Sequence, residues 1–255
     1  MSKNFRAKVI NNFALNPRTF LLEIEPIEET IAPKPGQFYM IQPDSSYDPL
    51  LKRPFSYIRK SNGKIQFLCA IKGKGTRLMM NFHSNKIISM LGPFGNGYPI
   101  FKSNHISLLI AGGTGIASIL SLSNEVQNKY LIYGARTRDE LLLLDKIEEL
   151  GDRFIVCTND CSYGKKGMVD ELLKDFINSH KDNINSIIIY ACGPLPMLKA
   201  ISKISAENNI KGFASLEENM ACGFGACLGC AVKTKQGYQR VCKEGPVFPF
   251  KEIIW

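Results

Sequence analysis

The chain has 255 residues, of which 45% are apolar and 22% charged, so it can bury a substantial core and should form two or three compact domains. Its formal net charge is +9, but the basic residues are scattered as singles and doublets, which argues against nucleic-acid binding. The start, MSKNFRAKVINNF, lacks the apolar segment of a signal peptide, and no apolar run reaches the roughly 20 residues of a bilayer span, so we expect a cytoplasmic protein that binds no membrane.

The first hundred residues read as short strands separated by turns. Their length, their period-two stretches and their Gly/Pro boundaries predict a small antiparallel barrel over residues 1–100. A short helix is expected near residues 76–82, and the Gly- and Pro-rich stretch 91–99 closes the domain. The expected strands are 5–13, 18–26, 37–43, 54–60 and 64–72.

From His105 the pattern changes to alternating strands and helices. Continuous apolar strands separated by amphipathic helices indicate a parallel sheet covered on both faces. We therefore predict a doubly wound, nucleotide-binding α/β domain over residues 101–211, followed by a Cys- and Gly-rich extension over 212–255. The expected strands are 106–113, 129–136, 153–160 and 186–193, and the expected helices begin near 115 and span 139–150, 168–179 and 196–205.

Four of the eight cysteines form the strongest signal in the sequence. Cys222, Cys227, Cys230 and Cys242 follow the plant-type x4, x2 and x11 spacing of [2Fe-2S] ligands. A cytosolic chain keeps its thiols reduced, so structural disulfides are not expected. A four-cysteine zinc site and free thiols are the alternatives, although zinc sites more often pair two short C-x2-C knuckles.

The residues around these ligands fit a cluster-binding loop. Glycine permits the dihedrals that a tight loop needs and lets backbone N–H groups approach the sulfurs. The small residues between the ligands are Gly223, Gly225, Ala226 and Gly229. Of the other cysteines, Cys69, Cys157 and Cys192 lie in apolar strands and are expected to be buried, while Cys161 receives no role.

Two motifs of the barrel are candidates for holding a flavin nucleotide. Arg53 can pair with a pyrophosphate, and Ser56 can approach the polar edge of an isoalloxazine ring. The segment Gly73–Thr76 precedes the short helix, whose free N–H groups could bind the same pyrophosphate.

The sequence Ala111–Ser118 follows an apolar strand and opens a helix, as a phosphate-binding turn requires. Its match to G-x-G-x-x-G/A is imperfect, and a tight turn without a ligand is the alternative. Ala191–Pro194 should lie at the same edge of the sheet. The strand that follows the 111–118 turn, expected at 129–136, ends in Gly134–Arg138 without the acidic residue that would bind the ribose hydroxyls of NADH. The sequence therefore leaves open whether the cofactor is NADH or NADPH.

The order of these sites describes an electron-transfer chain. A flavin accepts two electrons as hydride from a nicotinamide cofactor, whereas an iron-sulfur cluster carries one at a time. Only residues 243–255 follow the cluster segment, too few for a second substrate site, so the electrons should leave for a protein partner.

On the motifs RPFSY, GKGT, AGGTGIAS, YGART, ACGP and SLEENMACGFGACLGC, the chain resembles the ferredoxin-NADP reductase superfamily over nearly its full length. Within it the last motif resembles the family of electron-transfer subunits of type B dihydroorotate dehydrogenase. The resemblance implies FAD in the barrel, NAD(H) at the second domain, and a [2Fe-2S] cluster facing an FMN-containing catalytic subunit that oxidises dihydroorotate in pyrimidine synthesis. It also implies a heterotetramer with two copies of each subunit.

The resemblance carries roles onto individual positions. FAD contacts are expected at Arg53, Pro54, Phe55, Ser56, Ala70, Ile71, Lys72, Gly75 and Thr76. NAD contacts are expected at Gly112, Gly113, Thr114, Gly115, Cys192, Gly193 and Pro194, and the four C-terminal cysteines would hold iron. The chain departs from the family pattern at Ser118, where proline is frequent, and in the loop 158–164, where Asn159 and Cys161 are substituted.

Two further readings stay open. A reductase subunit of a ferredoxin-linked or hydrogenase-associated complex would share the cofactors and differ in its partner. A non-catalytic redox regulator would bind the cluster without oxidising NADH. Phe224, Leu228 and the apolar tail 247–255 either form the docking surface for the partner or pack against the nucleotide domain.

Overall fold

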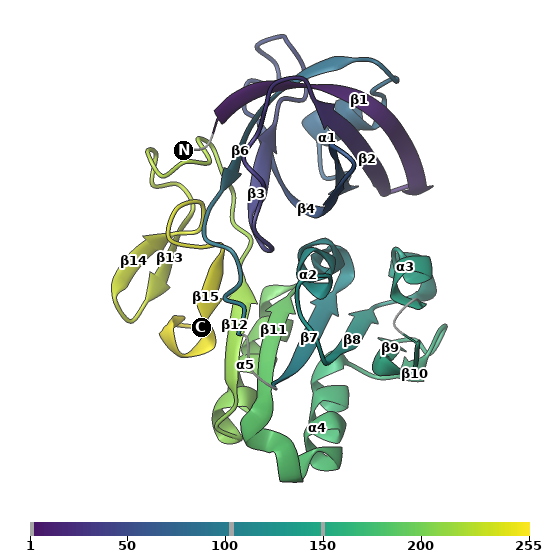
Figure 1. Ribbon diagram of the computed structural model, residues 1–255, viewed down its shortest axis with the longest axis vertical. Coiled ribbons are helices and arrows are strands. Elements are labelled where there is room, and N and C mark those ends of the chain that lie inside the picture. The colour runs from purple at the N-terminus through teal and green to yellow at the C-terminus, as the bar shows by residue number, and fades with distance from the viewer. Residues whose placement is uncertain (1–2, 102–104, 149–150) are drawn as a thin grey trace. The chain divides into compact units, whose positions relative to one another are not determined.

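The computed structural model describes residues 3–101, 105–148 and 151–255 (Figure 1). They form two compact units. The barrel unit comprises residues 1–97, 217–232 and 238–246, and the sheet unit comprises residues 98–216, 233–237 and 247–255. The C-terminal region is therefore shared between the units. The division of the sequence at residues 100 and 211 stays a prediction.

A closed six-stranded antiparallel barrel with the order β1-β2-β5-β4-β3-β6 forms the centre of the barrel unit, as predicted. The sixth strand was not expected, because Gly92 and Pro93 interrupt its sequence, yet it pairs with β1 and β3 and closes the barrel. The elements are β1 (Lys3–Asn16), β2 (Thr19–Pro26), β3 (Phe38–Ile41), β4 (Arg53–Ser61), β5 (Lys64–Ala70), α1 (Lys74–Met80) and β6 (Ile87–Phe94).

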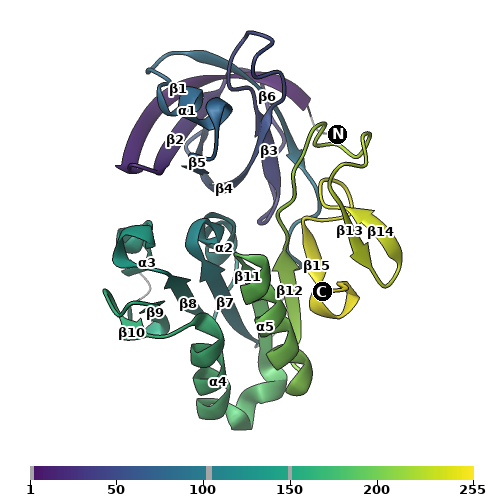
Figure 2. The same cartoon turned by 180° about the vertical axis from the view of Figure 1, so that it is seen from behind.

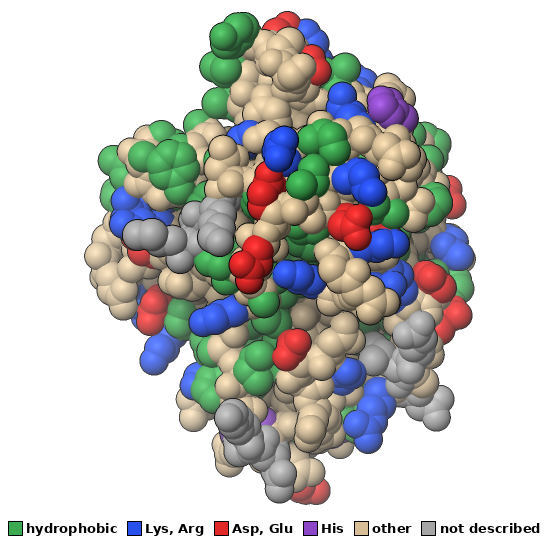
Figure 3. All heavy atoms as spheres, turned by 45° about the horizontal axis from the view of Figure 1, so that its top comes forward, with side chains coloured by type: hydrophobic (Ala, Val, Ile, Leu, Met, Phe, Trp, Pro, Cys, Tyr) green, Lys and Arg blue, Asp and Glu red, His purple; other side chains and the backbone are tan. Residues whose placement is uncertain are grey.

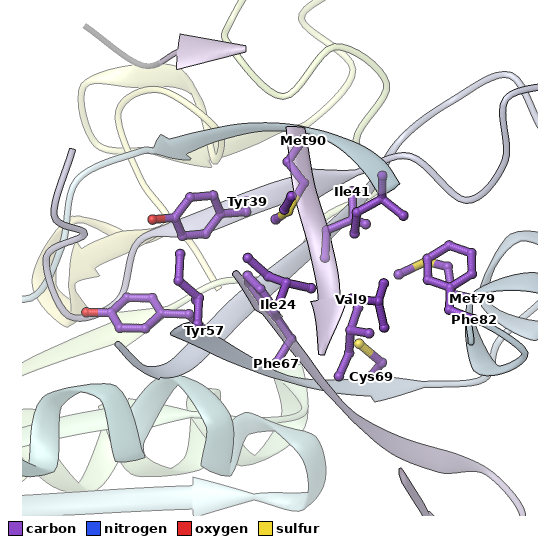
Figure 4. Packing of buried hydrophobic residues seen from close by; sticks show 14 of the residues in the cluster. Val9, Ile24, Tyr39, Ile41, Tyr57, Phe67, Cys69, Met79, Phe82 and Met90 are labelled. Carbon is purple, nitrogen blue, oxygen red and sulfur yellow. The ribbon is translucent and has the colours of Figure 1, made fainter. Parts of the chain in front are cut away.

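The barrel core consists of aliphatic and aromatic side chains that point inward from all six strands (Figure 4). Tyr39 and Phe67 meet edge to face at its centre, with ring centroids 5.6 Å apart. Met79 and Phe82, from α1 and the turn after it, close one end of the cluster. This packing makes the barrel a rigid support for the motifs at its rim.

The sheet unit is built on a seven-stranded sheet with the order β10-β9-β8-β7-β11-β12-β15. All neighbouring strands are parallel except the edge strand β15, which pairs antiparallel with β12. The strands are β7 (Ile106–Gly112), β8 (Lys129–Ala135), β9 (Phe154–Thr158), β10 (Lys165–Lys166), β11 (Ile187–Cys192), β12 (Lys211–Ser215) and β15 (Val247–Pro249). The parallel α/β architecture is as predicted, while β10, β12 and β15 were not expected.

Helices cover both faces of this sheet (Figures 1 and 2). The right-handed crossover from β7 to β8 places α2 (Ile116–Ser123) on one face. The crossovers into β11 and β12 run the other way, so α4 (Val169–Ser179) and α5 (Leu195–Glu207) pack together on the opposite face. The reversal of direction between β7 and β11 forms a topological switch point, where ligands bind in open α/β sheets.

The single helix predicted over 139–150 is not formed. A 3₁₀ turn, η2 (Arg138–Glu140), is followed by extended chain and then by α3 (Leu144–Glu148). Leu141 to Leu144 are all buried, which one amphipathic helix could not achieve, and Leu143 takes a positive φ. The last two residues of the predicted helix lie outside the described residues.

The remaining elements are short. A two-stranded sheet is formed by β13 (Ala231–Thr234) and β14 (Gly237–Arg240). Four 3₁₀ segments complete the fold: η1 (Gly113–Gly115), η3 (Gly151–Arg153), η4 (Lys181–Ser186) and η5 (Phe250–Glu252). Within the described residues, no helix is long and apolar enough to cross a bilayer. Basic and acidic side chains are interspersed on the face shown in Figure 3.

Phe67→Ala should lower the free energy of unfolding by about 3–5 kcal/mol, because it opens a cavity at the centre of the barrel core. Chemical denaturation measures this loss. Phe13→Ala is the control, since Phe13 is 51% exposed, and it should change stability by less than about 0.5 kcal/mol. Equal effects of the two substitutions would contradict the assigned core.

Candidate functional site

The barrel motif expected to bind FAD brings Arg53 directly over Gly75. A Cβ atom at Gly75 would lie 3.0 Å from Nε and 3.1 Å from Nη2 of Arg53, so glycine at this position lets the guanidinium group lie close to the backbone. Nη1 of Arg53 donates to the carbonyl of Leu51 at 2.7 Å, which fixes the guanidinium plane. A cation held over a glycine backbone is a suitable cradle for a pyrophosphate.

The turn before α1 is ordered by one hydroxyl. Oγ1 of Thr76 accepts the N–H groups of Lys72 at 2.9 Å and Gly73 at 3.1 Å. Arg53 to Ser56 lie at the start of β4 and are half-buried, and Ala70 ends the adjacent β5. The structure thus brings the predicted FAD residues of both motifs to neighbouring strand ends.

In the sheet unit, the two predicted NAD segments meet at one edge. β7 and β11 are adjacent and parallel, and Cys192 pairs in register with Ala111. A Cβ atom at Gly115 would lie 2.3 Å from the carbonyl oxygen of Cys192, and one at Gly193 would lie 3.0 Å from Cα of Gly112. These backbone approaches form the narrow turn that a nucleotide-binding helix start needs.

Ser118 has a buried partner that sequence analysis did not identify. Its Oγ lies 3.0 Å from the hydroxyl of Tyr98, which also bonds Ser215. Burial, together with the nearby Cys192, raises the pKa of Tyr98 well above its usual value. Ser118 therefore anchors the first turn of α2 to Tyr98, which proline could not do.

The substituted loop after β9 is tied to the end of β8. The N–H of Asn159 donates to the carbonyl of Ala135 at 3.2 Å, and the N–H of Arg138 donates to Oγ of Ser162 at 2.7 Å. Cys161 is exposed and takes a positive φ. This loop lies at the same sheet edge as the NAD segments, but its contribution to nucleotide binding stays a prediction.

The four predicted cluster ligands lie as two pairs. Sγ of Cys222 accepts the N–H of Cys227 at 3.5 Å, and Sγ of Cys230 accepts the N–H of Cys242 at 3.5 Å. Among residues 3–101, 105–148 and 151–255, no three or more ligand side chains converge as they would on one metal ion. These hydrogen bonds join the cysteines in the pairs that a two-iron cluster uses, in which two ligands bind each iron.

The thiols of Cys222 and Cys242 differ in acidity. Burial of Cys222 opposes ionisation, but N–H groups of Cys227, Phe224 and Ala226 outweigh it and lower the pKa of the thiol to about 6. Burial, with the hydrogen bond and charge of Cys230, raises the pKa of Cys242 to about 12. Thiolates stabilised by backbone N–H groups are the form that binds iron.

The cluster loop rests on strand β3 of the barrel. A Cβ atom at Gly223 would lie 2.5 Å from Cγ of Met40, and Gly223 takes a φ of +79°. Gly225 has a φ of +90°, so both positions need glycine, which adopts a positive φ without steric cost. Leu228 also takes a positive φ between two ligands, a strained conformation typical of functional loops.

Only part of the expected docking surface is exposed. Phe224 is 54% exposed and Leu228 62% exposed, although Phe224 also lies near Phe94, with ring centroids 6.4 Å apart. In the tail, Val247 and Phe248 are buried, and Phe248 pairs with Ala214 of β12. The start of the tail thus belongs to the sheet. Phe224 and Leu228 of the cluster loop and Ile254 near the end of the tail, which is 46% exposed, remain accessible apolar side chains.

Comparisons with known proteins agree with this geometry. Residues 217–254 match the model described as the iron-sulfur cluster binding domain of dihydroorotate dehydrogenase B. Residues 109–203 match the oxidoreductase NAD-binding domain.

Two relatives are similar over 100% of this chain and 100% of their own length. Both are named dihydroorotate dehydrogenase B (NAD(+)), electron transfer subunit. The protein from Caldanaerobacter subterraneus subsp. tengcongensis is 36% identical over 259 residues, and that from Desulforamulus reducens is 35% identical over 265 residues.

Solved structures share the fold. A chain from the structure of NADH-dependent reduced ferredoxin-NADP oxidoreductase is 25% identical, with a TM-score of 0.82, over 98% of this chain and 90% of that one. A ferredoxin NADP+ reductase from Neisseria gonorrhoeae with bound FAD and NADP is 18% identical, with a TM-score of 0.68, over 80% of this chain and 91% of that one.

Arg53→Ala should weaken FAD retention roughly ten- to a hundredfold, because charge-assisted phosphate contacts contribute about 1.5–3 kcal/mol. The flavin content after dialysis, read from the visible spectrum, measures this. Arg59→Ala is the matched control on the same strand, where Nε contacts Gln66 at 3.1 Å. Full flavin occupancy in Arg53→Ala would refute the assigned cradle.

Gly115→Ala should slow NADH-driven flavin reduction by tenfold or more, because the new methyl group cannot coexist with the Cys192 carbonyl oxygen. Stopped-flow measurement of flavin bleaching at several NADH concentrations would show the loss. The FAD content of the barrel is the internal control and should equal that of the wild type. Unchanged kinetics would exclude this turn from the nucleotide site.

Proposed function

This chain belongs to the family of dihydroorotate dehydrogenase B electron transfer subunits, and on that premise we propose that it moves electrons between NAD(H) and an FMN-containing subunit that oxidises dihydroorotate to orotate. It is a flavin- and NAD-dependent oxidoreductase of the ferredoxin-NADP reductase fold, with FAD, NAD and a [2Fe-2S] cluster as its cofactors. The name of the relatives implies a catalytic subunit as its partner.

The full-length similarity carries this proposal, together with the paired cysteines. The relative that is 36% identical aligns over the entire chain, and therefore over the residues of both units and of the cluster segment. The [2Fe-2S] ligands proposed here are the pairs Cys222–Cys227 and Cys230–Cys242. In each pair the sulfur of the first cysteine accepts the backbone N–H of the second.

When bound, FAD accepts a hydride and releases single electrons, and a [2Fe-2S] cluster carries them one at a time. Arg53 and the turn Gly73–Thr76 hold the pyrophosphate of the flavin nucleotide. Gly112–Gly115 and Cys192–Pro194 let the nicotinamide nucleotide approach the backbone at the sheet edge. Phe224 and Leu228 present an apolar surface beside the cluster ligands, suited to a protein partner.

We further propose residues 1–100 as the FAD-binding part, 101–211 as the NAD-binding part and 212–255 as the cluster-binding part. The assembly proposed is a heterotetramer with two copies of each subunit. We also propose a cytoplasmic location, since that compartment keeps thiols reduced and so able to bind iron.

The deciding experiment is to isolate the tagged protein from its native cells with its partner and to assay the complex for dihydroorotate-dependent reduction of NAD+. Recovery of an FMN-containing subunit with this activity supports the proposal. Recovery of a larger iron-sulfur flavoprotein without it would assign the chain to a ferredoxin-linked reductase, the kind of complex whose chain is 25% identical.

Cys227→Ser should abolish electron delivery to the partner while leaving NADH-driven flavin reduction within about twofold of the wild type, since only the cluster loses a ligand. Cys161→Ser is the matched control, because Cys161 is an exposed cysteine to which no ligand role is assigned. Iron content, flavin bleaching and partner turnover are measured on the same preparations. Full partner turnover in a cluster-free variant would disprove the electron-transfer path.

A further inference from the structure

Arg240 connects the two halves of the cluster-binding segment. It ends β14, two residues before Cys242, and its Nη1 donates to the carbonyl of Gly225 at 2.7 Å. Gly225 lies in the loop between Cys222 and Cys227. One guanidinium group therefore contacts the loop of the first cysteine pair and lies beside a ligand of the second.

The other face of the same guanidinium is occupied by Glu244. Nε of Arg240 donates to Oε2 of Glu244 at 2.9 Å, and Nη2 donates to Oε1. The backbone N–H of Arg240 donates to Oε2 at 2.8 Å. All three nitrogens of the planar fork thus donate a hydrogen bond, which fixes its orientation in a way that a lysine could not reproduce.

The ion pair is largely covered. The side chain of Arg240 is 25% exposed and that of Glu244 31% exposed. Charges in such a setting act over several ångströms with less screening than surface charges in water.

The pair is oriented relative to the ligands. The cation contacts the ligand loop at Gly225, and the carboxylate binds the opposite side of the guanidinium. The backbone of Glu244 is itself held, because its carbonyl accepts Nδ2 of Asn96 at 2.9 Å. The guanidinium group of Arg240, and not the carboxylate of Glu244, therefore makes the hydrogen bond to the ligand loop.

We propose that Arg240 and Glu244 form an oriented ion pair that sets the reduction potential of the [2Fe-2S] cluster. One-electron reduction adds one negative charge to the cluster, and a fixed cation nearer than its counter-anion stabilises the reduced state. Arg240 is a positioning and tuning residue, not a ligand. This inference rests on the proposed function, because it requires the cluster to be present.

The test is a redox titration of the purified holoprotein and of its Arg240→Gln and Glu244→Gln variants. The EPR signal of the reduced cluster reports the extent of reduction at each potential. Arg240→Gln should lower the midpoint potential by about 59 mV, which corresponds to an about tenfold change in the equilibrium constant of one-electron reduction. Glu244→Gln should raise it, because the charge of Arg240 is then uncompensated. Arg240→Lys, which keeps the charge and loses the fork, should shift the potential less than Arg240→Gln.

The matched control is the pair formed by Arg6 on β1 and Glu28 after β2, where Nε and the backbone N–H of the arginine also donate to the two carboxylate oxygens, at 2.8 and 2.7 Å. Arg6→Gln and Glu28→Gln should leave the potential unchanged. Shifts of the same sign in Arg240→Gln and Glu244→Gln, or no shift, would overturn the proposal. Loss of the cluster in all three site variants would likewise overturn it and leave a purely structural role.

Iron content and the EPR signal of the wild type distinguish failure of the proposed function from failure of the tuning role. A wild type without a cluster would refute the proposed function. A wild type with a cluster whose potential is insensitive to both charges would refute only the tuning role of the pair.

Discussion

Burial of strand β3 on both faces is the constraint on which the electron-transfer unit depends. Tyr39 and Ile41 point into the barrel core, while Phe38 and Met40 belong to the other face. The outer face of a barrel strand is normally exposed to solvent, yet all four residues of β3 are buried. The cluster loop covers that face at Met40, against which Gly223 lies too close for any side chain.

The same strand also carries the flavin motif. Met40 pairs with Pro54 and Ile41 with Arg53 across the β3–β4 ladder, and Phe38 pairs with Phe94 of β6. The ring of Phe94 lies 6.0 Å from that of Phe38 and 6.4 Å from that of Phe224. The proposed flavin and cluster sites thus share one rigid support, which keeps the separation between a two-electron and a one-electron carrier constant.

Much of this arrangement could be predicted from the sequence, and the elements and contacts that were missed have physical explanations. The cysteine spacing and the glycine-rich turns were readable because covalent geometry and close approach restrict the residue types locally. β6 was missed because Gly92-Pro93 resembles a turn, and β15 because three residues carry no periodicity. The bonds Ser118–Tyr98 and Arg240–Gly225 join residues 20 and 15 positions apart, and no local pattern encodes such contacts.

The pairing of β15 with β12 has a consequence for the chain between them. Ser215 lies opposite Val247, so the segment from 216 to 246 leaves and re-enters the sheet at directly opposed residues. Because its two ends lie opposite each other, the length of this segment does not affect the pairing of the strands that it connects. Each doubling of the length of a flexible loop costs only about 0.6 kcal/mol in closure entropy. Between residues 217 and 246, only 233–237 belong to the sheet unit, where Thr234 pairs with Ile253, so added length elsewhere in the stretch would leave the pairing of β15 with β12 intact.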